Sequence, residues 1–373
     1  MKQTRQITIF VQSDASTENS NGVAKIIFNV FARLPKTRVK FVVFGKPAPR
    51  SIYKQMGEVL YLNFDQTRRS YTTNKFLGIH ADDIKKIISF NESPDRIVVF
   101  GSFLGLRTLR KFKKQKVRLC FIDSAARYYF KFESANFAEM LLSKTVLLVS
   151  ETLYELLAKL RNYPIAYVSK KDKDFVRFGK NNCRVIENGV APVETAKYKN
   201  KGKVSRLVFL GNLDYSPNRH AVEYIAQNLC DHLKGYEFSV IGAGDRNLAQ
   251  KFGSITNLGF TGYLPDLSQY LNDNSIFIAP IFSGTGLQNK VLDAFAHKVP
   301  VIASDYSVAG ISCRAGVHYV RANTDVEFIN AIGSLSEDFE YRHRVVKNAE
   351  ALINTQYDWP SVVRQYEDFI FGK

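Results

Sequence analysis

Short apolar runs alternate with longer segments of helical periodicity along most of this 373-residue chain. Continuous apolar runs are typical of strands in a parallel sheet that helices cover on both faces. The runs form two series, so we predict two doubly wound α/β domains. The predicted strands are Ile7–Val11, Val39–Phe44, Arg96–Phe100, Val117–Ile122, Thr145–Val149 and Ile165–Val168 in the first half, and Arg206–Leu210, Glu237–Ile241, Ile276–Pro280 and Pro300–Ala303 in the second.

A polar, lysine-rich stretch without periodicity separates the two series, and we place an interdomain linker there, at residues 192–205. The domains are then residues 1–191 and 206–355. The last segment, residues 356–373, predicts an amphipathic helix that we expect to pack back on the N-terminal domain. Its apolar stripe consists of Val362, Val363, Tyr366, Phe369 and Ile370.

The net positive charge of the chain lies in its first half. Residues 1–190 contain 34 Lys and Arg against 16 Asp and Glu, which leaves 18 and 19 in the rest. A basic N-terminal domain attracts polyanions, including anionic lipid headgroups and phosphorylated substrates. Within it, Arg107–Arg118 favours a cationic amphipathic helix whose exposed face contacts an anionic membrane surface. The alternative is a solvated helix that only covers the sheet.

The spacing of cysteine and histidine predicts neither a metal site nor a disulfide framework. Cys120, Cys183, Cys230 and Cys313 are far apart, and the six histidines form no metal-binding motif. We expect no secretory signal, because the apolar stretch near the start covers only Ile7–Val11, and no apolar run is long enough to span a bilayer. We therefore expect a metal-free cytoplasmic protein, soluble or peripheral on the inner face of the membrane.

We expect the binding residues in the loops that follow strands, because open α/β sheets bind ligands beyond the carboxyl ends of their strands. In the second half, Gly211 and Asn212 follow one predicted strand and Gly242 follows the next. Glycines at these points either admit a ligand or serve only the geometry of the turn. Both interpretations remain open.

The segment after the strand Ile276–Pro280 gives the strongest indication of a binding site. Residues 283–286, Ser-Gly-Thr-Gly, form a short loop before a helix that we expect to begin at Leu287 or Gln288. Free backbone N–H groups and the positive end of the helix dipole favour an anion in such a loop. The pattern therefore predicts a phosphate site.

Two charged side chains in the first turns of this helix support that prediction. Lys290 adds a positive charge where the helix dipole disfavours one, which suggests an anionic neighbour. Asp293 lies one turn further along, on the same face as Asn289, where a carboxylate can accept hydrogen bonds from hydroxyls such as those of a ribose. The alternative is an ordinary exposed Lys290–Asp293 helix pair.

Residues Gly286–Ala296, GLQNKVLDAFA, resemble the signature of the retaining, group 1 family of glycosyltransferases with the GT-B fold, especially its exopolysaccharide-associated branch. Four other stretches are similar to that family in order and spacing: Gly22–Lys25, Val185–Val190, Val208–Asn218 and Gly259–Asp266. The resemblance is close over most of the second half and loose over the first.

The resemblance implies two Rossmann-like domains in a GT-B arrangement and transfer of a sugar, with retention, from a nucleoside-diphosphate sugar to a saccharide or lipid-linked saccharide. It implies polysaccharide or glycan biosynthesis, a UDP- or GDP-sugar as donor, and neither metal nor cofactor. Lys290 and Asp293 are then catalytic. The implied donor-binding residues are Gly211, Asn212, Gly242, Tyr263, Ser283, Gly284, Thr285, Gly286, Leu287, Gln288, Asn289, Lys290 and Asp293.

This chain departs from the family pattern at two points. Of the acidic pair Glu-x7-Glu, the second position falls on Asp293 and the first on Thr285, which removes a carboxylate near the transferred sugar. The loop after Leu210 also lacks the basic pair that holds the pyrophosphate in many members, and Arg219 is the nearest basic residue. Lys290, with the loop amides, is expected to take that role.

Candidate acceptor-side residues follow strands of the first half. Ser13 and Asp14 come after the first strand, and Gly22 opens the first helix. Asp123 follows the strand Val117–Ile122 and is our candidate for an acceptor-side base or sugar contact. A helix N-cap is the alternative role for Asp123.

Other functions are compatible with parts of this pattern. A nucleotide-sugar epimerase of the same architecture would have a similar donor site but would need no acceptor. Because Thr285 replaces a family carboxylate, a non-catalytic polyanion-binding or partner subunit is another alternative. Nucleic-acid binding is not expected, because no RNP, KH, zinc-finger or helix-turn-helix signature is present.

Overall fold

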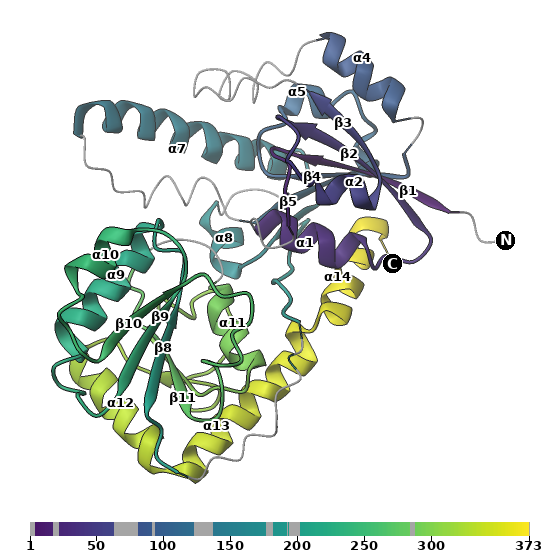
Figure 1. Ribbon diagram of the computed structural model, residues 1–373. Helices are drawn as coiled ribbons and strands as arrows, with labels where there is room; N and C mark the ends of the chain where they lie inside the picture. Colours follow the sequence, from purple (N-terminus) through teal and green to yellow (C-terminus); the bar gives the residue numbers. More distant parts are fainter. Residues whose placement is uncertain are drawn as a thin grey trace. The chain divides into compact units, whose positions relative to one another are not determined.

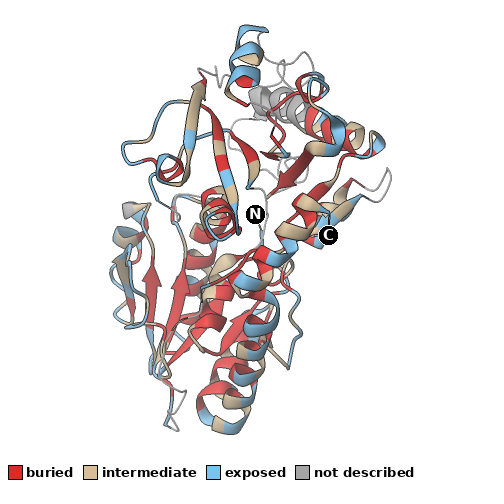
Figure 2. Ribbon diagram, turned by 90° about the vertical axis from the view of Figure 1, so that its right-hand side faces the viewer, coloured by how far each residue is buried: buried red, intermediate tan, exposed pale blue. Residues whose placement is uncertain are grey.

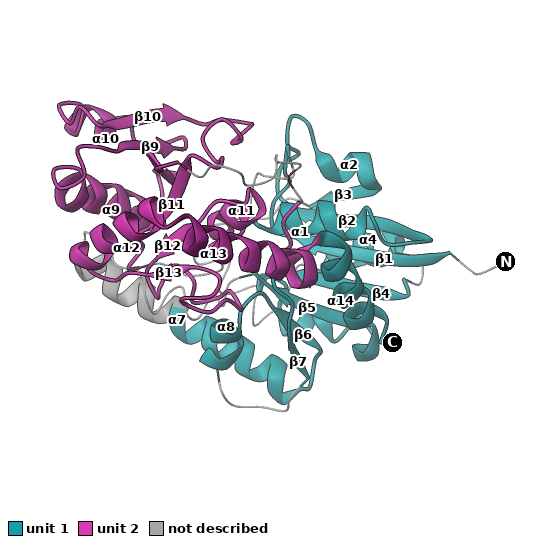
Figure 3. Ribbon diagram, turned by 90° about the horizontal axis from the view of Figure 1, so that it is seen from below, with its two compact units in different colours: residues 1–188, 359–373 teal, residues 189–358 magenta. Residues whose placement is uncertain are grey.

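The computed structural model describes residues 4–17, 22–62, 81–91, 94–122, 137–176, 182–191, 193, 202–283 and 288–372, apart from the side chains of residues 137–147 and 246. The chain forms two compact units (Figures 1 and 3). Unit 1 comprises Met1–Asn188 and Trp359–Lys373, and unit 2 comprises Gly189–Asp358. Each unit is built on one parallel sheet, which confirms the predicted fold class.

The described part of unit 1 has a seven-stranded parallel sheet in the order β3-β2-β1-β4-β5-β6-β7. The order reverses between β1 and β4, which makes that position the topological switch point. The strands are β1 Arg5–Val11, β2 Thr37–Phe44, β3 Glu58–Leu62, β4 Arg96–Phe100, β5 Val117–Phe121, β6 Ile165–Tyr167 and β7 Cys183–Val185. The helices are α1 Gly22–Phe31, α2 Ile52–Met56, α4 Ala81–Phe90, α5 Leu106–Leu109, the 3-10 helix η1 Lys114–Lys116, α7 Phe137–Leu160, α8 Lys170–Phe175 and α14 Trp359–Phe371.

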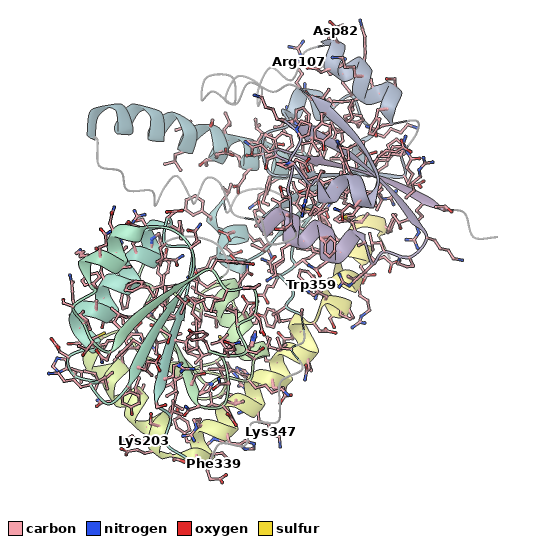
Figure 4. The ribbon with its side chains drawn as sticks, in the orientation of Figure 1. Asp82, Arg107, Lys203, Phe339, Lys347 and Trp359 are labelled. Carbon is pink, nitrogen blue, oxygen red and sulfur yellow. The ribbon has the colours of Figure 1, made fainter. Side chains whose placement is uncertain are left out.

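Both faces of this sheet are covered. Ile7 and Ile9 of β1 pack into one core cluster with α1 and α14, whereas Phe10 packs into a second cluster with α5 and α7. Trp359, labelled in Figure 4, begins α14 and is buried in the first cluster. Two arginines from neighbouring strands donate to carbonyls in the last turn of α14, which have no partner within the helix. These bonds join Arg96 Nε to Ile370 O and Arg118 Nε to Phe369 O, both at 2.7 Å.

Unit 2 has a six-stranded parallel sheet within its described residues, in the order β10-β9-β8-β11-β12-β13. Its switch point lies between β8 and β11. The strands are β8 Arg206–Leu210, β9 Glu237–Ile241, β10 Leu258–Gly262, β11 Ser275–Ala279, β12 Val301–Ala303 and β13 Val320–Arg321. The helices are α9 Ser216–Tyr224, the π-helix η2 Ile225–Leu229, α10 Arg246–Lys251, α11 Asn289–Ala296, α12 Asp325–Glu337, α13 Phe339–Leu352 and the π-helix η3 Ile353–Tyr357.

The central strands β8, β9, β11 and β12 of unit 2 are almost entirely buried, and buried strands are red in Figure 2. The edge strands β10 and β13 are mostly half-buried or exposed. Phe209 of β8 packs with α9 and α12 on one face, whereas Val208 and Leu210 pack with α11 and α13 on the other. Helices α9 and α11 therefore follow the two switch-point strands on opposite faces of the sheet. Their N-terminal turns meet at its carboxyl edge.

Two predictions about secondary structure were wrong. Thr145–Val149 lies inside the 24-residue helix α7, because a five-residue apolar run cannot by itself be distinguished from a helical segment. Arg107–Arg118 is not one helix: α5 ends at Leu109, η1 covers Lys114–Lys116, and β5 begins at Val117. The strands β3, β7, β10 and β13 were not predicted. No helix in the described part of the chain is both long and apolar enough to cross a membrane.

Candidate functional site

The loops that follow β8, β9 and β10 in unit 2 are joined by backbone hydrogen bonds at the carboxyl edge of the sheet. Gly211 N donates to Ile241 O at 3.0 Å, and Leu213 N donates to Ala243 O at 2.8 Å. Gly242 N donates to Gly262 O at 2.8 Å. Because the loops bond to one another, they form a rigid rim beside the switch point.

Two of the predicted glycines are required by this rim. A Cβ on Gly242, whose φ is +152°, would lie 1.8 Å from Gly211 O. A Cβ on Gly211 would lie 2.7 Å from the side-chain amide of Asn218. Both glycines thus have a packing reason that needs no ligand. Asn212 is exposed, and its Oδ1 accepts a hydrogen bond from Asp214 N at 2.9 Å, which closes the turn after β8.

A side-chain contact connects the two helices that follow the switch-point strands. Lys290, in the first turn of α11, donates from Nζ to Oδ1 of Asn218, in the first turn of α9. Asn218 is buried, and its Nδ2 donates to Asn212 O at 2.7 Å. The Lys290 ammonium also lies 4.9 Å from the ring centroid of Phe209 on β8. The lysine is therefore held at the carboxyl end of β8.

The charge of Lys290 has no anionic partner among the residues that the structure describes. Burial lowers the pKa of Lys290 to about 7, since the ammonium has lost water without gaining a carboxylate. The alternative of an ordinary Lys290–Asp293 ion pair is not what the structure contains: Asp293 is half-buried on the same helix, and Nζ points to Asn218 instead. A cation in this state favours binding of an anion.

The segment that leads from β11 toward α11 is supported by two buried serines. Ser304 donates from Oγ to Ile281 O, and Ser307 donates from Oγ to Ala279 O at 2.6 Å. In addition, Ile281 N donates to Ser307 Oγ at 3.3 Å. These bonds position the entry of the predicted phosphate loop, of which Ser283 is described and exposed.

An exposed aromatic side chain follows β10 on the same rim. Tyr263 directly follows Gly262 and is 68% exposed, although such a large ring is usually at least half buried. Such a ring has a free face on which a planar group can stack.

The start of α11 differs slightly from the prediction. The helix begins at Asn289, with Gln288 as its N-cap, rather than at Leu287 or Gln288. Gln288 is nearly buried, and its side chain makes no capping hydrogen bond. Gly284, Thr285, Gly286 and Leu287 lie outside the described residues, as does Asp123 in unit 1.

The candidate acceptor-side residues of unit 1 have different surroundings. Asp14 accepts four hydrogen bonds, two at each carboxylate oxygen: Oδ1 from Ala15 N at 2.8 Å and Ser51 Oγ at 2.7 Å, and Oδ2 from Ala48 N at 3.0 Å and Tyr61 Oη at 2.6 Å. The carboxylate therefore ties the loop after β1 to the segment before α2 and to β3.

The hydrogen bonds of Asp14 also affect the pKa of one of their donors, Tyr61. Burial, together with the hydrogen bond to Asp14, raises the pKa of Tyr61 to about 12. Ser13 is exposed. Gly22 begins α1 where a Cβ would lie 3.2 Å from Ile122 Cγ2, just after β5. Of the three candidates, Asp14 thus has an evident structural role.

Sequence reasoning missed Asn218, Ser304 and Ser307. Asn218 is the last residue of the family-like stretch Val208–Asn218, but its bond to Lys290 spans 72 residues and was not predicted. An asparagine directly after Pro217, at the start of a helix that follows a strand and a loop, is the weak sequence signal for it. The serines carried no sequence signal. In the described parts of the chain, no group of three or more His, Cys, Asp or Glu side chains is placed to hold a metal ion.

Residues 204–338, nearly all of unit 2, match the family model described as "Glycosyl transferases group 1". A protein of Klebsiella pneumoniae, described as an uncharacterized 44.6 kDa protein in the cps region, is 28% identical over 106 residues. That alignment covers 28% of this chain and 27% of the Klebsiella protein. The sequence similarity thus concerns part of both proteins.

Solved structures extend the similarity to the fold of nearly the whole chain. Sucrose-phosphate synthase of Thermosynechococcus elongatus has a TM-score of 0.72 at 14% identity and covers 98% of each chain. Anabaena Alr3699/HepE in complex with UDP and glucose has a TM-score of 0.70 at 13% identity, over 99% of this chain and 100% of that chain. The same Anabaena protein in complex with UDP-glucose has a TM-score of 0.69 at 14% identity, with the same coverage.

At these identities the solved structures establish the fold, and the family match concerns unit 2. The chain therefore has the two-domain, Rossmann-like GT-B fold, and its residues 204–338, which contain the Lys290 site, are similar to the group 1 glycosyl transferases.

Proposed function

We propose that this protein is a glycosyltransferase whose unit 2 binds a nucleoside-diphosphate sugar at the carboxyl edge of its sheet. The observation that carries the proposal is Lys290, a half-buried cation without a carboxylate partner among the described residues, at the switch point of the sheet. A diphosphate supplies the missing negative charge. The family match over residues 204–338 supports the same assignment.

In the proposed reaction, the bond between the anomeric carbon and the diphosphate oxygen breaks, and negative charge develops on the leaving diphosphate. Lys290 stabilises that charge, because an ammonium already held in place needs no reorganisation during the step. Asp293, three residues further along α11, accepts hydrogen bonds from the ribose hydroxyls. The resemblance of Gly286–Ala296 to the retaining family supports retention without a metal or cofactor.

For the donor, we propose a UDP- or GDP-sugar. The Anabaena protein with the same fold binds UDP and UDP-glucose, which supports the uridine nucleotide. Tyr263 offers its exposed ring to the base, and exposed Ser283 lies at the start of the loop that we assign to the phosphates. For the acceptor, we propose a saccharide or lipid-linked saccharide in polysaccharide or glycan biosynthesis, with Asp123 as the base.

The test is release of free nucleoside diphosphate from a panel of UDP-, GDP- and ADP-sugars, with and without a membrane lipid extract. Wild type is compared with Lys290→Ala and Asp293→Ala. Acceptor-dependent release from one donor, lost in both variants, would support the transferase and identify its base and sugar. Conversion of the donor to an isomer without acceptor would instead show an epimerase.

Two further outcomes concern the donor site itself. If no donor is turned over and none raises the melting temperature, unit 2 has no working donor site and a non-catalytic partner subunit becomes the better explanation. If a donor binds but no acceptor accelerates its release, the nucleotide site stands and the acceptor assignment fails.

We further propose that unit 1 contacts an anionic membrane surface, on the cytoplasmic face. A surface cavity of about 670 Å³ is lined by Arg110, Phe112, Lys114, Leu160, Arg161, Asn162 and Tyr163. Its three cations form no ion pair among the described residues, and Lys114 lies 6.0 Å from the ring centroid of Tyr163. Arg107, on the adjoining helix α5, is also exposed (Figure 4). This cavity suits phosphate headgroups.

An apolar stripe on α7 leads to that cavity. Val149 and Leu160 are each 57% exposed and Leu153 is 39% exposed, and the three share one face of the helix. The opposite face, with Tyr154 and Ala158, is buried in the core of unit 1. Exposed apolar side chains next to unpaired cations are typical of helices that lie in a membrane interface.

Sedimentation with vesicles tests this surface. We expect binding to vesicles that contain 30% phosphatidylglycerol and little binding to pure phosphatidylcholine, with a loss of tenfold or more in affinity for a triple Arg110→Ala, Lys114→Ala, Arg161→Ala variant. Removal of three exposed cations elsewhere in the chain, Lys85→Ala, Lys86→Ala and Lys251→Ala, serves as the control. Equal losses in both variants would reduce the effect to net charge and overturn the assignment to this cavity.

A further inference from the structure

We propose that Asn218 is a positioning residue: its carboxamide holds the Lys290 ammonium at the carboxyl end of β8 through a neutral oxygen, so that a bound diphosphate, and not the protein, neutralises the lysine. The identity of the ligand rests on the proposed function. The positioning role itself rests on contacts within unit 2 and can be tested without a ligand.

The orientation of the Asn218 carboxamide is determined by its two neighbours. Its Nδ2 donates to the carbonyl of Asn212 at 2.7 Å, and its Oδ1 accepts from Lys290 Nζ. A flipped carboxamide would direct its NH2 group at an ammonium and its oxygen at a carbonyl, and both contacts would be repulsive. The Oδ1 atom of Asn218 is therefore fixed in one position, and Lys290 Nζ donates to it there.

The backbone around Asn218 prevents the side chain from moving away. Asn218 N donates to Tyr215 O at 2.9 Å, and the preceding Pro217 occupies the first turn of α9. Gly211 packs directly on the carboxamide, since a Cβ there would approach it to 2.7 Å. The buried carboxamide is thus fixed by the loop after β8, and it fixes Lys290, which comes from the other side of the switch point.

The charged groups near this contact are already engaged or lie elsewhere. On α9, Arg219 donates from Nη1 to Asp214 O at 2.8 Å, and thus bonds to the backbone of the loop after β8. On α11, Asp293 lies three residues beyond Lys290 and forms no ion pair with it. From β8, only the neutral ring of Phe209 contacts the ammonium.

The chemistry explains why an amide suits this position better than other side chains. A carboxylate of the same shape would pair with Lys290 and then repel a diphosphate. An apolar side chain would leave the half-buried Lys290 ammonium without an acceptor, which is more costly than the neutral hydrogen bond. An amide oxygen orients the cation and leaves its net charge available.

The experiment measures the titration of Lys290 in the ligand-free protein by NMR of lysine labelled with 13C at Cε, assigned by the signal missing in Lys290→Met. We expect Asn218→Asp to raise the pKa of Lys290 from about 7 to above about 8, and Asn218→Ala to lower it. The two shifts have opposite signs, so either variant alone is informative if the other does not fold.

The matched control is Asn228→Asp, in the same unit. Asn228 donates from Nδ2 to Tyr224 O at 3.1 Å, and it is not part of the Lys290 contact, so its variant should leave the Lys290 titration unchanged. A Lys290 titration that is the same in Asn218→Asp, Asn218→Ala and wild type would overturn the positioning role. So would equal shifts in Asn218→Asp and Asn228→Asp.

Binding of UDP, measured by calorimetry at pH 7.5, separates this proposal from the proposed function. We expect Asn218→Asp to weaken UDP binding by about tenfold or more, because a carboxylate then faces the diphosphate, and Asn228→Asp to have no effect. If Lys290 responds to Asn218 as expected but wild type binds neither UDP, GDP nor ADP, the positioning role stands and the donor-site assignment fails.

Discussion

Asp14 in unit 1 and Lys290 in unit 2 both lie at the carboxyl edge of a sheet, beside its switch point. Their charges differ in how many hydrogen-bond partners the protein supplies. Asp14 follows β1, and Lys290 reaches the end of β8; each of these strands borders the switch point of its sheet. The carboxylate of Asp14 accepts four hydrogen bonds within unit 1. The ammonium of Lys290 has one neutral acceptor among the described residues.

Under the proposed function, this difference separates a charge that holds the fold together from a charge that binds a ligand. A carboxylate with four donors is stabilised by the protein itself, and its hydrogen bonds join three segments of unit 1. A half-buried ammonium that has no carboxylate partner in the described part of the chain destabilises the empty protein, and an anion that binds there compensates it. Position at a switch point therefore does not by itself identify a binding residue, and the proposal for Lys290 depends on its unsatisfied charge as well.

The largest expected effect is on transfer by a Lys290→Met variant. Release of nucleoside diphosphate should fall by about a hundredfold or more, because the leaving group loses its preorganised cation. At the same time the variant should be more stable than wild type at pH 6. The control is Lys251→Met, which removes a surface lysine paired with Glu223 at 2.9 Å and should change neither quantity.

The pH dependence of that stability difference follows from the lowered pKa. Lys290 has a pKa of about 7 in the folded chain and 10.5 as the ordinary value, so between these values the unfolded chain binds more protons. Wild type therefore gains stability as the pH rises from about 7 toward 10.5, and its deficit relative to Lys290→Met narrows. Thermal melts from pH 6 to 10 measure this, and a constant difference would contradict the buried-charge interpretation.

The second-largest expected effect is a loss of stability when Asp14 in unit 1 is replaced. Asp14→Ala should lower the free energy of unfolding by about 2–4 kcal/mol, because two backbone N–H groups and two hydroxyls lose a charged acceptor. Affinity for UDP should not change. Denaturant unfolding is compared with Asp82→Ala, an exposed residue whose loss should matter little. Full stability combined with loss of transfer would make Asp14 an acceptor-side residue and remove the contrast with Lys290.

A smaller effect tests whether Gly242 is needed for packing of the loops after β8, β9 and β10 or for contact with a ligand. Gly242→Ala should destabilise by about 2 kcal/mol or more, since its φ is +152° and the new Cβ would meet Gly211 O at 1.8 Å. Gly333→Ala is the control: it lies in α12 with open space around it and should stabilise by about 0.5–1 kcal/mol. A Gly242→Ala variant that keeps its stability and loses nucleotide binding would assign this glycine to the ligand.

The smallest effect concerns Tyr263. Replacing this 68% exposed ring by alanine should leave the melting temperature unchanged and weaken UDP binding by about tenfold, the loss expected for one base-stacking contact. Val326→Ala removes another exposed apolar side chain of unit 2, 60% exposed, and should affect neither quantity. Unchanged UDP affinity in Tyr263→Ala would remove this residue from the donor site.

Strand positions show where the sequence was informative about the fold. Arg96–Phe100, Arg206–Leu210 and Glu237–Ile241 were predicted with the bounds that the structure has, because a buried parallel strand needs a continuous apolar run. The strand Glu58–Leu62 was missed, since it lies at the edge of the sheet and most of its side chains remain partly exposed. Thr145–Val149 was assigned to a strand because the same run also suits a helix that covers a sheet.

The sequence by itself determined two parallel α/β units, the location of the positive charge and the segment in which Lys290 lies, because these depend on local patterns and on composition. Only the tertiary structure decided which charges are satisfied. Asn218 and Lys290 are 72 residues apart, and Asp14 and Tyr61 are 47 apart, so their hydrogen bonds exist only once the sheets bring the loops together. Whether a charged residue supports the fold or awaits a ligand depends on those non-local contacts.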